Sequence, residues 1–244
     1  PKIISNVAIA NQNLHGLRDI QYLVITNDVL TGQAQRLADY HKINSNFTTK
    51  VVPLKQIYNE FGSGSSDVTA IRDFVKHLYD NSSSDEFRVK YLCLFGDASY
   101  DYKDRIPNNN NLVPVFLSYN SFNLATSYVT DDYYGMMDAN EGGMSGSNRQ
   151  DVVTGRILVS DDAQATIAVD KILAYNNENS FGSWRNSITL VTDDMKNPTE
   201  FRFVTDMDKL ADDIKNIKPQ YNIKKIYSDA YVQLETAGGN RYPE

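Results

Sequence analysis

Cysteine, histidine and long apolar runs are all scarce in this chain of 244 residues. The single cysteine, Cys93, excludes an internal disulfide and any metal site built from several cysteines. No apolar run approaches the roughly 20 residues that a membrane-spanning helix needs, and the sequence shows no secretory signal. We therefore expect no membrane insertion by this chain.

Positive charge is also in deficit, because 24 Lys and Arg stand against 31 Asp and Glu, a net charge of −7. This balance argues against nucleic acid or an anionic membrane as the main partner. The chain begins with Pro1 and stops after "GGNRYPE". Such ends are typical of a piece cut from a longer protein, which leaves an exported parent open.

Apolar runs alternate with helical periodicity after an arm or linker over residues 1–19. We expect strands at the short apolar runs 21–26, 49–54, 88–95, 151–159, 187–194 and 223–227. We expect helices at 31–43, at 65–80 with Ser66 or Asp67 as the cap, from Ser160 to Leu173, and over 203–217. This alternation predicts an α/β fold, with a mostly parallel sheet and helices on both faces.

Cys93 is expected to be a buried core residue rather than a nucleophile. A catalytic thiol must be reachable and paired with a base, usually a histidine. His15 lies in the arm, and His41 and His77 lie late in helices, away from the strand ends where open α/β sheets bind ligands. The three histidines are therefore expected to be surface or packing residues.

Asp97 directly follows a strand, and Gly96 lets the chain turn, so this aspartate belongs on the carboxyl-end rim of the sheet. Asp28, Asp193 and Asp194 are expected at the same edge. Rim acids suit a metal site, a phospho-acceptor or simple loop caps. The phospho-acceptor is the weakest of these, because Asp97 lacks a second carboxylate two residues on.

The segment "DANEGG" (138–143) suits a hard cation. Asp138, Asn140 and Glu141 offer closely spaced oxygens, and the two glycines permit the sharp turn that calcium loops require. The spacing matches an EF-hand loop only in part. A solvated acidic turn is the alternative.

Arg156 stands in a strand otherwise made of apolar and small residues. A buried arginine needs carboxylate or carbonyl partners. We expect it to brace the loops around Asp97 or around Asp131 and Asp132.

Four motifs follow one another along the chain: "YLCLFGD" (91–97), "TDDYYG" (130–135), "VVTGR" (152–156) and "VDKILAYN" (169–176). Their order and spacing resemble the gingipain-type cysteine peptidases. Longer matches, among them "AIRDFVKHLY" and "FGDASYDYKDR", are most similar to the sortase of the type IX secretion system. The resemblance covers roughly residues 20–244.

This resemblance implies a caspase-like α/β/α peptidase domain of two side-by-side subdomains. The parent would be an exported endopeptidase or sortase of the bacterial outer membrane or cell surface. It would process the C-terminal signals of type IX secreted proteins, with those proteins and other secretion-system proteins as partners. The family's Gly-His-Gly motif and its later catalytic Cys do not occur here. We therefore expect residues 20–244 to be a truncated first subdomain with no activity of its own.

The resemblance also implies a structural calcium ion. The family's ligands correspond to Asp97, to the turn with Asp138, Asn140 and Glu141, and to Asp151 before the "GR" strand. The chain departs from the family in the insert 98–129 and in the stretch 195–206. No acidic specificity residue is recognised there, so no cleavage preference is implied.

Two other classes stay open. One is a non-catalytic α/β module with a structural calcium site, whose rim loops hold a protein partner. The other is a metal-dependent hydrolase that uses the rim acids. A parent gene that continues to a Gly-His-Gly and a later Cys would favour the peptidase.

Overall fold

The computed structural model describes residues 11–119, 122–123, 125–144, 146–194, 201–235 and 241–243. The chain separates into two compact units, Pro1–Tyr175 and Asn176–Glu244. From the sequence we expected residues 20–244 to form one subdomain. The division after Tyr175 therefore assigns the last predicted strands to a unit of their own.

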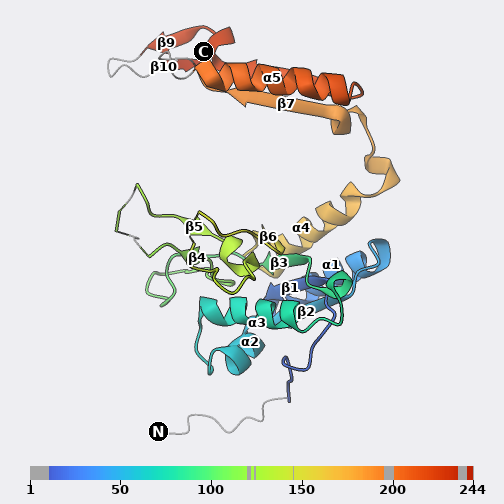
Figure 1. Ribbon diagram of the computed structural model, residues 1–244, viewed down its shortest axis with the longest axis vertical. Coiled ribbons are helices and arrows are strands. Elements are labelled where there is room, and N and C mark those ends of the chain that lie inside the picture. The colour runs from blue at the N-terminus through green and yellow to red at the C-terminus, as the bar shows by residue number, and fades with distance from the viewer. Residues whose placement is uncertain are drawn as a thin grey trace. The chain divides into compact units, whose positions relative to one another are not determined.

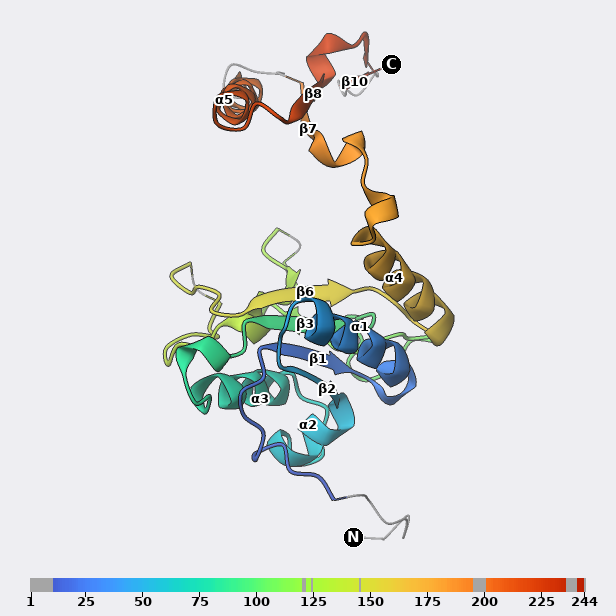
Figure 2. The same cartoon turned by 90° about the vertical axis from the view of Figure 1, so that its right-hand side faces the viewer.

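The first unit is built on a parallel sheet in the order β2-β1-β3-β6 (Figure 1). Its strands are β1 (Tyr22–Thr26), β2 (Thr49–Pro53), β3 (Tyr91–Phe95) and β6 (Val153–Ile157). Figure 2 shows these strands side by side, with β6 outermost. The predicted α/β fold with a mainly parallel sheet is confirmed.

Helices cover both faces of this sheet because the side chains of each strand alternate between two apolar clusters. Leu23 and Leu92 pack in one cluster with α2 (Leu54–Phe61) and α3 (Val68–Asp80). Val24 and Cys93 pack in the other with α1 (Thr31–Asn44) and α4 (Asp162–Tyr175). The result is a three-layer α/β/α unit.

The caps of α3 and α4 follow from local sequence. The Asp67 side chain accepts the Thr69 N–H at 2.8 Å, as predicted for this start. Asp161 accepts the Gln164 N–H at 2.8 Å, and the Gln164 side chain accepts the Ser160 N–H at 3.0 Å. This reciprocal pair resembles a capping box.

Short elements fill the connections of the first unit. They are η1 (Asp28–Leu30), η2 (Asp85–Phe87), β4 (Phe116–Leu117), β5 (Val129–Thr130) and η3 (Asp132–Gly135). The strands β4 and β5 pair with each other in antiparallel fashion. They lie in the long Asn- and Tyr-rich stretch that the sequence left without secondary structure.

The second unit holds a parallel pair of strands, β7 (Ser187–Thr192) and β8 (Asn222–Tyr227), with α5 (Phe201–Ile217) between them in sequence. Its other elements are η4 (Glu178–Ser180), η5 (Ser183–Asn186), η6 (Ser228–Ala230), β9 (Gln233–Glu235) and β10 (Arg241–Pro243). Because β7 pairs with β8 in a separate sheet, the expectation that Asp193 and Asp194 lie on the same sheet edge as Asp97 is wrong.

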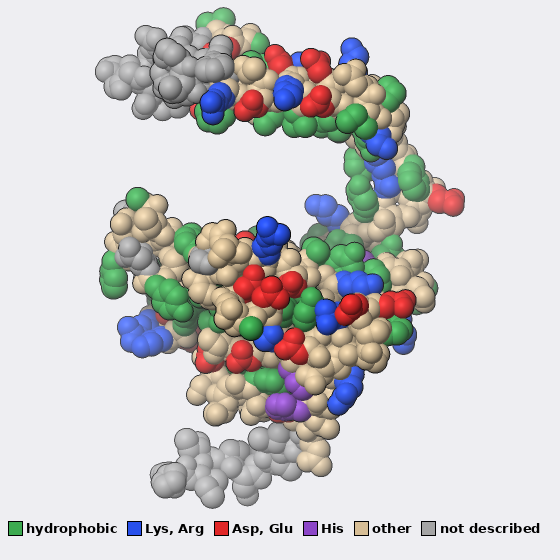
Figure 3. Space-filling view, viewed as in Figure 1, with side chains coloured by type: hydrophobic (Ala, Val, Ile, Leu, Met, Phe, Trp, Pro, Cys, Tyr) green, Lys and Arg blue, Asp and Glu red, His purple; other side chains and the backbone are tan. Residues whose placement is uncertain are grey.

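The apolar residues of α5 are buried only in part. Ala211 is buried, but Phe203, Leu210 and Ile217 are exposed, because two strands are too narrow to cover all of these residues. In Figure 3 charged side chains cover the part over α5 and hydrophobic side chains line the adjoining side over β7. None of the helices in the described ranges is long and apolar enough to cross a membrane.

Candidate functional site: the carboxyl edge of the first sheet

Asp97 lies on the carboxyl-end rim of β3, as the sequence predicts. Its N–H donates to the carbonyl of Val159 at 3.0 Å, so the chain stays paired beyond the strand. Its carboxylate accepts the Ser160 hydroxyl and the Asn110 side-chain N–H, the latter at 2.8 Å. Asp97 therefore ties the 98–113 loop to the start of α4, which is the loop-cap role among the three alternatives.

Gly96 is required at this turn. Its φ is +147°, a conformation that side chains disfavour, and a Cβ there would stand 3.0 Å from the Val113 side chain. The loop returns onto Asp97, whose carbonyl accepts the N–H groups of Leu112 and Val113 at 3.0 and 2.9 Å. The glycine thus lets the rim loop pack directly against the strand end.

Arg156 is the bracing residue that the sequence predicts. Its side chain is 9% exposed, and its guanidinium forms a two-bond contact with Asp131 at 2.8 and 2.7 Å. The remaining N–H groups donate to the carbonyls of Gly96 at 2.8 Å, Val113 at 2.7 Å and Pro114 at 3.3 Å. All five donors of the guanidinium are thereby used. One side chain holds β3, the loop that leads to β4, and the residue that follows β5.

A cleft of about 730 Å³ opens beside this cation. Its walls combine polar groups from the rim with apolar side chains from the insert and from the end of β6. They are Ala98, Ser99, Tyr100, Ile106, Asn110, Val115, Val129, Thr130, Asp131, Arg156 and Leu158. Because Arg156 is neutralised by Asp131, the cleft suits an uncharged, partly apolar ligand group.

The predicted calcium set does not assemble into one site. Tyr91 of β3 stands opposite Val153 of β6, so Asp97 follows the carboxyl ends of these strands while Asp151 precedes the amino end. The strand length alone separates them by more than about 13 Å. Ligands of one calcium ion lie within about 5 Å of one another. Asp97 is therefore excluded from a site with Asp151.

The other predicted ligands close a turn on α3. Glu141 accepts the N–H groups of Asp138 at 3.1 Å and Arg149 at 2.7 Å, and Asp151 accepts that of Met137 at 2.8 Å. Arg72 donates to the carbonyl of Met136 and Lys76 to that of Met137. Asn140 lies in the same turn.

Within the described ranges no three His, Cys, Asp or Glu side chains are grouped so that they could hold a metal ion. Calcium binding by Asp138, Asn140, Glu141 and Asp151 stays a prediction.

Cys93 is buried against α1, as predicted. Burial raises the pKa of its thiol to about 12, although the Tyr22 hydroxyl and Arg156 act in the opposite direction. His41 contacts the Tyr22 ring, with 4.4 Å between centroids, and burial lowers its pKa. No described histidine pairs with the thiol, so a Cys–His dyad is not formed here.

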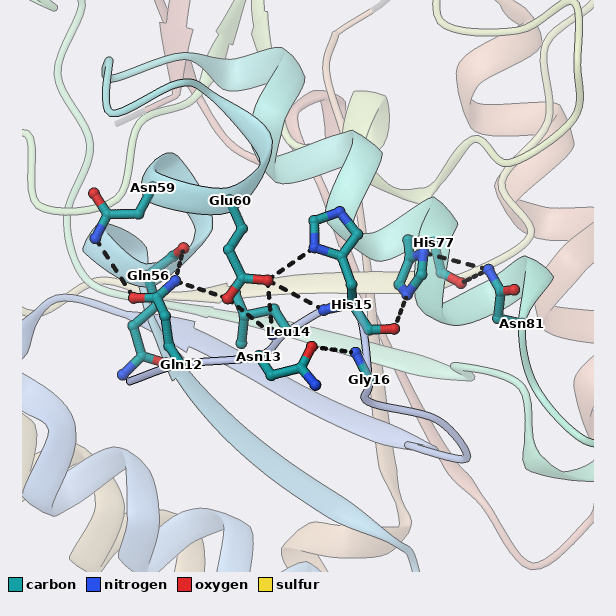
Figure 4. A network of polar contacts seen from close by, with 10 residues as sticks. All are labelled: Gln12, Asn13, Leu14, His15, Gly16, Gln56, Asn59, Glu60, His77 and Asn81. Carbon is teal, nitrogen blue, oxygen red and sulfur yellow. Dashed lines mark hydrogen bonds and ion pairs between the residues drawn. The ribbon is translucent and has the colours of Figure 1, made fainter. Parts of the chain in front are cut away.

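The arm is anchored by a network that the sequence did not reveal (Figure 4). The Glu60 carboxylate on α2 accepts the Leu14 N–H at 2.8 Å, the His15 Nδ1 at 2.8 Å and the Gln12 side chain at 2.8 Å. Burial alone would raise the pKa of Glu60, but these hydrogen bonds together lower it to about 2. His77 on α3 hydrogen-bonds the His15 carbonyl at 3.0 Å. The arm is thus part of the first unit from at least Gln12 onward.

The comparisons with known proteins agree with this α/β/α arrangement. The sequence profile of Peptidase family C25 matches residues 15–244. This chain belongs to Peptidase family C25. The predicted gingipain-type relationship is therefore confirmed.

Among solved structures the C25 chain is similar to dimeric latent PorU from Porphyromonas gingivalis, with a TM-score of 0.60 and 31% sequence identity. The match covers 72% of this chain and 17% of the PorU chain, so the present chain spans a small part of that relative. No curated protein matches it significantly.

Proposed function

We propose that this chain is a structural, catalytically incomplete part of a gingipain-like cysteine endopeptidase. The parent is a sortase that removes C-terminal signals from proteins exported by type IX secretion. Membership of Peptidase family C25 and the likeness to PorU support this role. The same likeness supports a place at the outer membrane or cell surface, with exported proteins as substrates.

The state of the Cys93 thiol is the main support for the proposal that this chain is structural and not catalytic. The only thiol of the chain is buried, its pKa is raised to about 12, and Tyr22 rather than a histidine lies beside it. A thiol in this state is not ionised near neutral pH. This state of Cys93 supports a catalytic pair that lies outside the 244 residues of this chain.

The contribution of the first unit is a stiff rim. Arg156 and Asp97 fix the loops at the carboxyl edge of the sheet by hydrogen bonds to groups far away in sequence. Such a rim is suited to form one wall of a substrate cleft, because groups that position a substrate must be held in place before it binds.

Deletion of the parent gene in its own bacterium tests the sortase role. We expect the C-terminal signals to remain attached to exported proteins after deletion. We expect their removal to return when the parent carrying Cys93→Ala is restored, because this thiol takes no part in catalysis. Signals that are still removed after deletion would reject the sortase role. A folded Cys93→Ala parent without activity would reject the structural role given to this residue.

A further inference from the structure

We infer that the free edge of β6 is a docking site for an extended segment of a partner protein, which adds to the first sheet as a fifth strand. The inference concerns this edge alone, and it holds whether or not the parent cleaves peptides.

The backbone direction of β6 identifies which groups are free. Val153 donates its N–H to the carbonyl of Lys90, and the carbonyls of Ile157 and Val159 accept the N–H groups of Gly96 and Asp97. Odd-numbered residues of β6 therefore turn their backbone groups toward β3. In a strand, the residues between them turn theirs the other way. Those residues are Thr154, Arg156 and Leu158.

The first backbone group on the outer edge of β6, the N–H of Val152, already has a partner. The carbonyl of Gly135 accepts the N–H of Val152 at 3.1 Å, so a segment of this chain caps the amino end of the edge. Beyond it, the backbone groups of Thr154, Arg156 and Leu158 have no protein partner among the described residues. An unpaired row of this kind is a template for another strand.

Hollows lie on both sides of the edge. The side chains of Arg156 and Leu158 line the 730 Å³ cleft. A second hollow of about 270 Å³ is lined from the opposite face by Val153, Gly155 and Ile157, together with Tyr22, Tyr91 and Cys93. Leu92, Thr154 and Arg156 also border it. Gly155 stands opposite Cys93 in the register and has no side chain to fill this space.

These two hollows match the geometry of an added strand. Successive side chains of a strand point to opposite faces, so alternate side chains would enter the two hollows while main-chain groups pair with β6. Val153 is 63% exposed and Leu158 is 72% exposed, so apolar surface borders both hollows. The internal pairing of Arg156 with Asp131 leaves no charge to be matched. The occupant is therefore an uncharged extended segment with apolar side chains at alternate positions.

Selection of random decapeptides on the intact chain provides the probe. With a selected peptide bound, we expect hydrogen exchange to slow at the amides of Thr154, Arg156 and Leu158. Leu158→Lys should weaken binding at least tenfold. The matched control is Ile43→Lys on α1, at a side chain that is 79% exposed, and it should leave binding unchanged.

A second control lies in the peptide. N-methylation of every second peptide residue should abolish binding when it blocks the N–H groups that face β6. N-methylation of the residues between them should leave binding unchanged. Selection that yields no binder, or binders that protect other amides, would overturn the inference. Protection of these amides in the free chain would also overturn it. If that protection rises with protein concentration, a second copy occupies the edge; if it is independent of concentration, the chain's own second unit does.

Discussion

Replacing Arg156 by methionine should strongly destabilise the first unit. The substitution removes five N–H donors and leaves the Asp131 carboxylate and three main-chain carbonyl groups without them. Removal of one partner from a buried ion pair costs about 3–5 kcal/mol. Because 21% of the Asp131 side chain remains exposed, we expect the lower end, about 3 kcal/mol.

Arg36→Met is the matched control. Arg36 donates to Asp170 at 2.6 Å, close to the 2.7 Å between Arg156 and Asp131. The two side chains of this control pair are 43% and 58% exposed, however. An exposed pair contributes about 0–1 kcal/mol. The difference between the two variants therefore measures burial and not the loss of an arginine as such.

Urea unfolding supplies the assay, with hydrogen exchange of the β3 and β6 amides to follow the first unit. The only tryptophan, Trp184, lies in the second unit, and its fluorescence should report an unchanged transition. Combined with Asp131→Asn, Arg156→Met should show a coupling of about 1–3 kcal/mol. A loss below about 1 kcal/mol for Arg156→Met, or strictly additive effects of the two substitutions, would refute the reasoning.

Three further predictions concern single groups. The Cys93 thiol should react with a disulfide reagent at pH 8 at least about a hundredfold more slowly in the folded chain than in urea, because burial suppresses its ionisation; fast native labelling would contradict this. Glu60→Gln should destabilise the chain by about 1–2 kcal/mol at pH 7, after allowance for solvent screening, since the pKa of Glu60 is lowered from 4.5 to about 2. This difference is fully present above pH 4.5 and should vanish as the pH falls toward 2; a constant difference in pH-dependent unfolding would disprove the assigned pKa. Calorimetry with calcium or a chelator tests the 138–151 turn: we expect a calcium-dependent rise in Tm that Glu141→Gln removes and Asp97→Ala keeps, and an unchanged Tm would eliminate the site.

Much of the first unit could be predicted because its central strands, β1 and β3, are buried on both faces. Runs such as "YLVIT" and "YLCLF" stand out as continuous apolar segments. The apolar period of α3 likewise identifies its buried face. The helix α2 was missed although Leu54, Ile57, Tyr58 and Phe61 have the spacing i, i+3, i+4 and i+7 of an apolar helix face. It starts directly after Pro53, and from the sequence we assigned Leu54 to the preceding strand.

The candidate site was predictable where a residue conflicts with its surroundings. Arg156 interrupts an apolar strand, and this conflict alone predicts carboxylate and carbonyl partners. The partners of Asp97 are 13 and 63 residues away. The partners of Glu60, which are Gln12, Leu14 and His15 in the arm, are 45 to 48 residues away. Contacts over such separations leave no periodic signal in one sequence. The grouping of Asp97 with Asp151 failed for the related reason that spacing does not reveal which end of the sheet a loop occupies.

The contacts of Arg156 connect the two proposals made for this chain. Arg156 turns its backbone toward the free edge of β6 and its side chain toward the carbonyl of Gly96 and the Asp131 carboxylate. The residue that stiffens the rim therefore also fixes the position of the outward backbone row. A partner strand that pairs with this row would meet an edge that is already ordered, so little entropy would be lost by the protein on binding. Weakening the brace should accordingly reduce docking even where Leu158 and the apolar walls of the cleft are untouched.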